Sequence, residues 1–416
     1  MILVVKSKIQ NPKSKILIVG AGPSGASLAI RLARENFRVC LIERERFPRP
    51  KLCGEFISPE CLEHFRELDV LDEMLSAGGE RIAETVFYAP SGKSIGVPTR
   101  WFNNDSQGAL SLSRAEMDFQ LLEKAKRVGV EVLEEQSAVG LLQEKNEIRG
   151  VKVRTKDGEV KEIFAELFVD ATGRARILGN LISRKGAKMQ SSKIQNPKSK
   201  IQNRLVGFKA HLRSVNLERG VCEIYFFRGG YGGLSFVENG LANFCFLIKA
   251  ETVKEFAGDA GKIIEQLIFQ NKRAFEALKN AEPVHDWLAV SVDGFGQKDL
   301  NPVANLFAVG DAGAFIDPFT GSGMLMAMES AEILARAIVV NPAADKIAEQ
   351  YKIEHARRFQ RRLFICSLMR RAAFVPVLSK ILISALSIGD FPRKMLARAT
   401  RPAVSVSKIH QSRKNL

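Results

Sequence analysis

The stretch KILIVGAGPSG at residues 15–25 decides the fold. Its apolar first half predicts a buried strand, and its second half has the spacing Gly-x-Gly-x-x-Gly. The first glycine of this pattern permits a tight turn, the second lets a diphosphate approach the backbone, and the third lets a helix pack closely. The start of that helix offers unpaired N–H groups to the phosphates. The residues predicted to bind a dinucleotide here are Gly20, Gly22, Pro23, Ser24 and Gly25.

The next segments complete a β-α-β unit. Residues 24–35 place leucine and alanine side chains on one face of a helix, and residues 39–43 (VCLIE) have the pattern of a second buried strand. An acid at the end of this strand is suited to bind ribose hydroxyl groups. Glu43, with Arg44 next to it, is therefore assigned to the dinucleotide site.

The chain is long and apolar enough for one large or two ordinary domains, with 416 residues of which 46% are hydrophobic. Its six cysteines show no metal-ligand spacing and are too few for a disulfide framework. The N-terminal MILVV is short for a signal peptide, and no stretch is a clean transmembrane span. We therefore expect a cytoplasmic protein without a bound metal.

The net charge of +16 is concentrated at the C-terminus. Residues 357–416 hold fourteen Lys or Arg and a single acid, Asp390, and an interrupted apolar stretch lies at residues 372–389. Two interpretations stay open: a region that lies on an anionic membrane surface, peripheral to the cytoplasmic face, or helices packed on the substrate domain with solvated arginines. Nucleic acid is not an expected partner, because the rest of the chain is not basic and aromatic residues are sparse among the cations.

The unit SKIQNPK occurs within residues 6–16 and returns within residues 192–203. It is polar, contains proline and lacks an apolar stripe of helical period. We interpret it as an insertion tolerated at two surface sites, the alternative being a binding motif displayed twice.

Local signals predict the remaining elements. Ser58 is expected to cap a helix, Ser113 and Glu116 to form a capping box, and residues 90–93 to form a hairpin turn. A β meander is expected at residues 130–170 and one helix at residues 260–279. The expected division is an N-terminal extension at 1–14, a discontinuous dinucleotide-binding domain at 15–82, 110–180 and 300–345, a substrate domain at 83–109 and 204–299, an inserted loop at 188–203, and a basic helical region at 346–416.

A second motif, far along the chain, identifies the cofactor. VGDA at residues 309–312 closes a strand, and DPFTGSG at residues 317–323 leads into a helix. With Gly-x-Gly-x-x-Gly, and in this order, these segments resemble the FAD-dependent family of geranylgeranyl reductases, aromatic-ring hydroxylases and flavin-dependent halogenases. The resemblance implies FAD and an α/β fold: a Rossmann-like FAD-binding domain of the p-hydroxybenzoate hydroxylase and glutathione reductase type, an interleaved antiparallel substrate sheet, and C-terminal helices.

The same resemblance assigns roles to single residues. Asp311 would bind the FAD ribitol, and Arg114 would approach the phosphates, although a turn acid and a solvated helix residue are the alternative interpretations. The helix start after DPFTGSG would face the pyrimidine end of the flavin, where its N–H groups suit the negative charge of the reduced ring. The other residues assigned to FAD are Val139, Ala171, Gly173, Gly310, Pro318, Gly321, Ser322, Gly323 and Met324.

PKLCGE at residues 50–55 matches a Pro-x-x-Cys-Gly-Glu-like segment of the reductase branch. The resemblance implies that it borders the flavin and the substrate cavity, with Gly54 allowing close approach to the ring. Cys53 has three interpretations: a pocket wall that contacts the cofactor, a packed small side chain, or a nucleophile, which would need a base or a lowered pKa. The candidate catalytic residues are Cys53, Glu55 and Tyr231.

Two segments depart from the family patterns. Around residues 168–174, Thr172 precedes Gly173, and Arg176 stands where hydroxylases place a serine, which weakens the hydroxylase assignment. In the reductase strand motif Tyr-x-Trp-x-Phe-Pro, Tyr231 is kept but Gly233 replaces the tryptophan. This glycine either leaves volume for a bulky or flat substrate or is simply a sheet residue without a side chain.

The sequence thus predicts an FAD-dependent oxidoreductase that acts on a hydrophobic small molecule, foremost a geranylgeranyl reductase-like enzyme that reduces a C=C bond. The alternatives are a monooxygenase of an aromatic or polyketide substrate, and a flavin-binding, membrane-associated protein without turnover. No second Gly-x-Gly-x-x-Gly follows a strand. Electrons are therefore expected from NAD(P)H that docks transiently or from a redox carrier protein.

Overall fold

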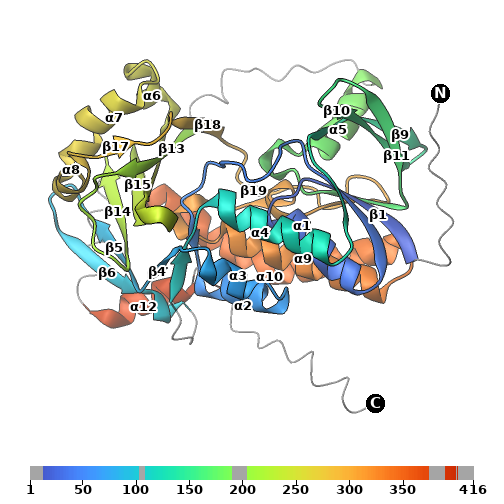
Figure 1. Cartoon of the computed structure of the whole chain (residues 1–416), viewed down its shortest axis with the longest axis horizontal. Helices are drawn as coiled ribbons and strands as arrows, with labels where there is room; N and C mark the ends of the chain where they lie inside the picture. The colour runs from blue at the N-terminus through green and yellow to red at the C-terminus, as the bar shows by residue number, and fades with distance from the viewer. Residues whose placement is uncertain (1–12, 103–107, 190–203, 374–388, 400, 402–416) are drawn as a thin grey trace, which may run out of the picture.

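The computed structural model describes residues 13–102, 108–189, 204–373, 389–399 and 401. A mostly antiparallel sheet, in which only the β5–β14 pair among the described strands is parallel, lies with its helices at one end of an elongated molecule, and a parallel sheet with its helices lies toward the other end (Figure 1). The repeat at residues 192–203 and most of the repeat at residues 6–16 lie outside the described residues.

Five parallel strands form the central sheet, in the order β20-β12-β1-β2-β8. Strand β1 begins at Lys13, inside the segment that the sequence assigned to the N-terminal extension, because the end of the first repeat joins the sheet. The bounds are β1 Lys13–Val19, α1 Pro23–Arg34, β2 Phe37–Ile42, β8 Glu131–Leu133, β12 Leu167–Asp170 and β20 Leu306–Ala308. The carboxyl ends of these strands carry the motifs found in the sequence.

Alternate side chains of β1 fill two different cores. Ile16 and Ile18 pack with the helices on one face of the sheet, and Leu17 and Val19 pack on the opposite face against a three-stranded antiparallel sheet. A strand buried on both faces explains the unbroken apolar run ILIV. The covering elements are α4 Arg114–Arg127, α9 Gly323–Val340, β9 Gln136–Glu144, β10 Glu147–Thr155, β11 Val160–Phe164 and α5 Ile177–Met189.

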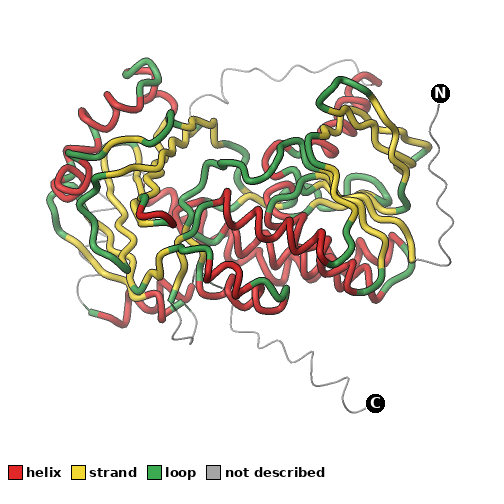
Figure 2. Tube along the Cα trace, viewed as in Figure 1, coloured by secondary structure: helices red, strands yellow, loops and turns green. Residues whose placement is uncertain are grey.

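The second large sheet runs in the order β17-β13-β16-β15-β14-β5-β6, with β18 paired to β13. Short helices cover its outer face, as Figure 2 shows. The strands are β5 Glu84–Tyr88, β6 Ser94–Pro98, β13 Leu205–Arg213, β14 Val221–Phe227, β15 Gly230–Phe236, β16 Ala242–Lys249, β17 Glu282–Pro283 and β18 Leu288–Val292. A hairpin turn joins β5 to β6 as predicted, with the Gly92 N–H donating to the Ala89 carbonyl at 2.9 Å.

Short elements link the two large sheets. A small sheet has the order β3-β7-β4 and packs beside two helices that follow the Cys53 segment. Their bounds are β3 Phe56–Ile57, α2 Pro59–Glu67, α3 Leu71–Ser76, β4 Glu80–Ile82 and β7 Ala109–Ser111. The remaining short elements used below are η6 Gly310–Ala312, β21 Ala314–Phe315, which pairs with β19 Gly296–Gln297, and η7 Pro318–Thr320.

Three local predictions were wrong in detail. The single helix expected at residues 260–279 is broken into α7 (Ala260–Gln266), a short 3-10 turn and α8 (Lys272–Leu278), because the Asn271 side chain caps α8. Ser58 stands at the N-cap of α2 and Pro59 in its first turn, as predicted, but the Ser58 side chain makes no capping hydrogen bond. The Ser113 hydroxyl does accept from the Glu116 N–H at 3.1 Å, but the Ser113 N–H donates to Glu238 instead of Glu116.

The C-terminal region forms two described helices, α10 (Ala344–Ala373) and α12 (Asp390–Ala399). Helix α10 does not present all its arginines to the outside, because Arg358 and Arg362 bind the buried carboxylate of Glu329 on α9. The apolar stretch at residues 374–388 lies outside the described part of the chain. Among the described helices, none combines the length and the apolar character needed to cross a bilayer.

Candidate functional site

The glycine-rich turn connects β1 to α1 and touches the neighbouring strand end. Gly20 has φ of +101°, and a Cβ there would lie 2.5 Å from the Ala171 carbonyl oxygen. A Cβ on Gly25 would lie 1.9 Å from the Gly20 carbonyl oxygen. Both glycines are therefore required by the fold itself.

Gly22 differs from these two glycines because it faces open space. The one group within 4 Å of a Cβ built there is the Arg114 guanidinium, at 3.9 Å. A cradle of backbone opposite an arginine, at the N-terminus of α1, is suited to a diphosphate. The shape of the turn therefore fits a diphosphate, and its contact with FAD stays a prediction.

Further cations lie near Arg114, at the edge of this cradle. Burial lowers the pKa of Lys51, and the nearby charges of Arg114, Arg49 and Arg44 lower it further. Four cations whose fields overlap favour an anion between them. The Arg44 side chain is itself largely exposed and lies 3.2 Å from Glu45, so Arg49 is the residue that turns inward from this segment.

Arg114 is fixed by its own helix. Its guanidinium makes two hydrogen bonds of 2.8 Å to the fully buried carboxylate of Asp118, one helical turn later. Arg49 approaches the same carboxylate at 3.5 Å. Sequence reasoning found Arg114 but missed Asp118, which the spacing of four residues on one helix face would have indicated.

Glu43 lies at the end of β2, where the sequence placed it, and its carboxylate touches the glycine-rich turn. It accepts hydrogen bonds from the Ala21 N–H at 2.9 Å and from the Glu45 N–H at 3.1 Å. Glu43 therefore shapes the turn itself, and its contact with a ribose stays a prediction.

The two FAD motifs meet at the carboxyl ends of β1 and β20. Gly310 has φ of +59°, and a Cβ there would lie 2.6 Å from the Ser24 hydroxyl oxygen. The next residue, Asp311, is partly buried, and no described residue donates a hydrogen bond to its carboxylate. Burial raises its pKa to about 6, although Arg174, Arg114 and Lys51 lower it. A carboxylate without a hydrogen-bond donor among the described residues is suited to a ligand whose hydroxyl groups donate to it.

The segment after β21 leads from Asp311 to α9. Asp317 accepts a hydrogen bond from the Phe319 N–H at 2.9 Å and one from the Tyr231 hydroxyl at 3.3 Å. Pro318 opens η7, and Gly321 ends it with φ of +60°. Ser322, Gly323 and Met324 form the start of α9, and the contact of their N–H groups with the pyrimidine end of the flavin stays a prediction.

The end of β12 explains the departure at Thr172. The Thr172 hydroxyl and N–H both donate to Asp170, at 2.5 and 3.1 Å, and the hydroxyl accepts from the Ile177 N–H. Gly173 has φ of +66° with open space around it. Val139 is the unpaired residue of a bulge in β9. The contacts of Ala171, Gly173 and Val139 with FAD stay predictions.

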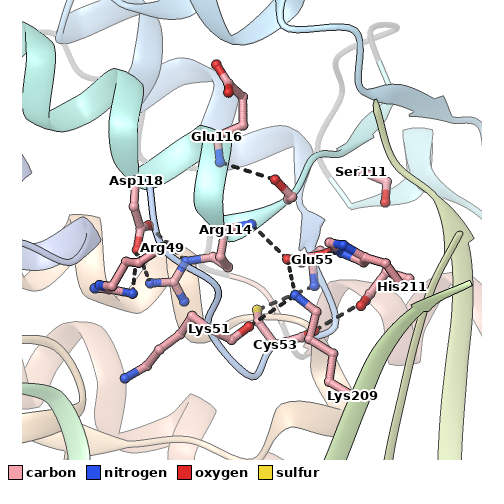
Figure 3. A network of polar contacts seen from close by, with 12 residues as sticks. Arg49, Lys51, Cys53, Glu55, Ser111, Arg114, Glu116, Asp118, Lys209 and His211 are labelled. Carbon is pink, nitrogen blue, oxygen red and sulfur yellow. Dashed lines mark hydrogen bonds and ion pairs between the residues drawn. The ribbon is translucent and has the colours of Figure 1, made fainter. Parts of the chain in front are cut away.

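The Cys53 segment lies between Arg114 and the strand of the substrate sheet that carries Lys209 and His211 (Figure 3). Cys53 is half-buried, its sulfur accepts the Glu55 N–H at 3.4 Å, and its carbonyl accepts from Asn243 at 3.2 Å. Gly54 is exposed, with nothing within 4 Å of a Cβ built on it. The Arg114 guanidinium also interacts with the sulfur, and no base lies within hydrogen-bond distance of it among the described residues. This placement agrees with a wall of the cofactor pocket, and the contact with the cofactor stays a prediction.

Glu55 is fully buried among three donors, of which sequence reasoning missed Lys209 and His211. Its carboxylate accepts hydrogen bonds from Lys209, from His211 and from the Arg114 N–H. Lys209 and His211 alternate along β13 with Phe208, Ala210 and Leu212, which fill the core on the other face. The signal was a lysine and a histidine two residues apart in an otherwise apolar strand, since such residues share one face.

Tyr231 lies in an aromatic cluster, and its ring packs edge-on against Phe319 at 5.1 Å between centroids. A Cβ on Gly233 would lie 3.1 Å from the Ile224 side chain. Only the end of the Ile224 side chain and, at 3.9 Å, the Glu223 carbonyl oxygen lie within 4 Å of that Cβ among the described residues, and the use of this volume by a substrate stays a prediction.

One described cluster, His64, Glu67 and Glu332, has ligand atoms within 4.8 Å of one another. Arg31 donates to Glu67 at 2.8 Å and lies 3.1 Å from the His64 ring nitrogen. The Arg31 guanidinium therefore already supplies the positive charge that a metal ion would bring to this cluster.

Known proteins share this architecture. The chain is 27% identical over 349 residues, 81% of either chain, to digeranylgeranylglycerophospholipid reductase 2 of Methanopyrus kandleri. A geranylgeranyl bacteriochlorophyll reductase-like structure from Thermoplasma acidophilum has a TM-score of 0.72 at 20% identity, covering 93% of this chain and 96% of that one. A flavin-dependent brominase has the same TM-score at 18% identity, covering 92% of each.

The family model described as "FAD binding domain" matches residues 13–363, which include the cradle, Asp311 and the substrate sheet. The predicted fold is therefore confirmed, and the protein is an FAD-dependent oxidoreductase. The chain belongs to the FAD binding domain family.

Proposed function

We propose that this protein reduces a C=C bond of a hydrophobic, isoprenoid-like small molecule. The observation that carries the proposal is the place of the PKLCGE segment, which runs from the cation-lined cradle to the substrate sheet and leaves the backbone at Gly54 open. The same segment carries the resemblance to the reductase branch, and the relative from Methanopyrus kandleri is a reductase of a geranylgeranyl lipid.

The residues of this chain divide the work. Arg114 and the cradle at Gly22 would hold the diphosphate, and Asp311 would accept hydroxyl groups of the ribitol. Bound FAD, once reduced by its electron donor, would supply the hydride, and a proton from solvent would complete the addition to the C=C bond. The aromatic cluster of Phe226, Tyr231 and Phe319 would exclude water and pack against an apolar substrate. Tyr231 is held in place by its hydrogen bond to Asp317.

The runner-up is a monooxygenase of an aromatic or polyketide substrate. The TM-score to a flavin-dependent brominase equals the TM-score to the reductase-like structure. The monooxygenase alternative is therefore kept. The two functions differ in what happens to oxygen and in which donor reduces the flavin. NAD(P)H that docks transiently and a redox carrier protein are both proposed as donors.

The deciding experiment uses FAD-loaded protein and a geranylgeranyl lipid. Anaerobic reduction with dithionite, followed by mass spectrometry of the lipid, should show the gain of two hydrogen atoms for each double bond reduced. NADPH oxidation in air with peroxide formation, and no hydrogenated lipid, would favour the monooxygenase instead. A flavin that is reduced and reoxidised without any product would favour a flavin-binding protein without turnover.

We further propose that the protein binds the surface of anionic membranes through α10. Phe364 and Leu368 are 71% and 60% exposed, and Arg357 and Arg361 lie on the same outer side of the helix. Exposed apolar and cationic side chains together suit an anionic interface. Binding to a membrane surface would bring the protein close to a hydrophobic substrate dissolved in the bilayer.

A further inference from the structure

We propose that Glu55, Lys209 and His211 form an interdomain clamp that positions the flavin-side segment against the substrate sheet. Glu55 comes from the segment after β2, and Lys209 and His211 come from β13 of the substrate sheet. In this role Glu55 is a positioning residue, and the proposal rests on the FAD site but not on which substrate is reduced.

The carboxylate of Glu55 is saturated by donors from both domains. One oxygen accepts from the Arg114 N–H at 2.8 Å and from the Lys209 ammonium, and the other accepts from the His211 Nε2 at 2.7 Å. Glu55 is 0% exposed and Lys209 is 3% exposed. Removing one partner of such a buried charge pair strongly destabilises the protein, because the other charge stays buried and unpaired.

The backbone of Glu55 shows that its position is imposed. Its φ is +56°, a conformation that non-glycine residues rarely adopt. Both backbone groups are anchored, since the Glu55 N–H donates to the Cys53 sulfur and the Glu55 carbonyl accepts from the Leu112 N–H at 3.3 Å. Such conformations persist where the surroundings over-determine them, typically at functional sites.

The clamp reaches the cofactor cradle along two short routes. Glu55 holds the N–H of Arg114, and the guanidinium of that same residue faces Gly22. Lys209 also donates to the Lys51 carbonyl at 3.1 Å. A change in β13 is therefore transmitted to two of the cations that surround the diphosphate position (Figure 3).

The charge state supports this assignment. Burial would raise the pKa of Glu55, but the hydrogen bond from His211 and the charge of Lys209 outweigh it, so the net direction is downward. Glu55 therefore stays ionised and keeps both donors from β13. His211 is the more exposed partner, with 21% of its side chain accessible.

The test is whether a substitution in the substrate sheet alters FAD binding. Lys209→Met should weaken FAD affinity about tenfold and shift the flavin midpoint potential, although the lysine lies on the substrate sheet. Lys209→Arg should restore both. Lys249→Met on the neighbouring strand β16, where the lysine side chain is half-exposed and pairs with Glu251, is the matched control and should change neither.

A double variant keeps the test valid if Lys209→Met folds poorly. Glu55→Gln with Lys209→Met removes both charges, so it should fold and bind FAD better than Lys209→Met alone. The dissociation constant is measured by flavin fluorescence and the potential by dye-coupled reduction, and neither needs a substrate. The proposal is overturned if Lys209→Met lowers the melting temperature but leaves the FAD dissociation constant and the potential at wild-type values.

Discussion

Gly310 lies directly against Ser24, although the two residues come from opposite ends of the FAD-binding region. A Cβ on Gly310 would lie 2.6 Å from the Ser24 hydroxyl oxygen and 3.0 Å from its Cβ, and the φ of Gly310 is +59°. The residue before Asp311 therefore packs on the helix that begins at the cradle. This contact makes the two motifs one site.

Gly310→Ala should destabilise the protein by about 1–3 kcal/mol, because it adds both backbone strain and a steric clash. Urea unfolding of the FAD-free protein measures the change. Ser24→Gly in the same background should recover part of the loss, since it removes the clash but not the strain. Full stability of Gly310→Ala alone would contradict the observed contact.

Gly22→Ala and Gly25→Ala should separate binding from folding. A Cβ on Gly22 meets only Arg114 at 3.9 Å, whereas a Cβ on Gly25 would lie 1.9 Å from a carbonyl oxygen. Gly22→Ala should keep the wild-type melting temperature but lose FAD, because the methyl group fills the cradle. Gly25→Ala should unfold at lower temperature whether FAD is present or not. Thermal melts with and without FAD check both, and a Gly22→Ala protein that binds FAD normally would remove the cradle from the site.

Much of this site could be predicted because its residues are consecutive. The spacing of Gly20, Gly22 and Gly25 predicts the turn, and the apolar strand that ends before Asp311 predicts the second motif. Periodicity could also place α1 and α9, since each has a broad apolar face.

The rest depends on contacts between distant segments. Lys209 and His211 are close to Glu55 only because β13 crosses the Cys53 segment, and no local pattern encodes that approach. Thr172 departed from a family pattern for a reason seen only in three dimensions, its hydrogen bonds to Asp170. The breaks at residues 260–279 were missed because Asn271 caps a helix inside an otherwise helical pattern.

Asp311→Asn should stabilise the FAD-free protein at neutral pH and weaken FAD binding. Burial raises the folded-state pKa of Asp311 to about 6. Its contribution to stability is therefore fully present below the unfolded pKa and is lost as the pH rises through about 6. The cost of the ionised form is at most about 3 kcal/mol. The melting temperatures of the wild type and Asp311→Asn should coincide near pH 4 and differ by pH 7. Equal melting temperatures at both pH values would contradict the raised pKa of Asp311.

Cys53→Ala should keep FAD bound and retain most turnover, because the sulfur is partly buried, accepts a weak hydrogen bond from the Glu55 N–H and otherwise interacts with the Arg114 guanidinium, which Asp118 holds in place. Flavin absorbance measures retention, and the lipid assay measures turnover. Cys245→Ala is the matched control, since burial raises the pKa of this neighbouring thiol to about 12 and keeps it protonated. Loss of turnover in Cys53→Ala alone, with flavin retained, would restore the catalytic thiol.

The outer side of α10 gives the sharpest test of membrane binding. Phe364→Ser with Leu368→Ser should reduce flotation with anionic liposomes, and added salt should reduce it in the wild type as well, because the flanking arginines contribute. Val160→Ser with Phe164→Ser on β11, where the side chains are 50% and 56% exposed, removes comparable apolar surface elsewhere and should change nothing. Truncation after Gln360 is a poorer test, because it also takes Arg362 away from the buried Glu329. Equal flotation of the wild type and both double variants would contradict membrane binding through α10. It would favour the interpretation of the basic tail as packed helices with solvated arginines.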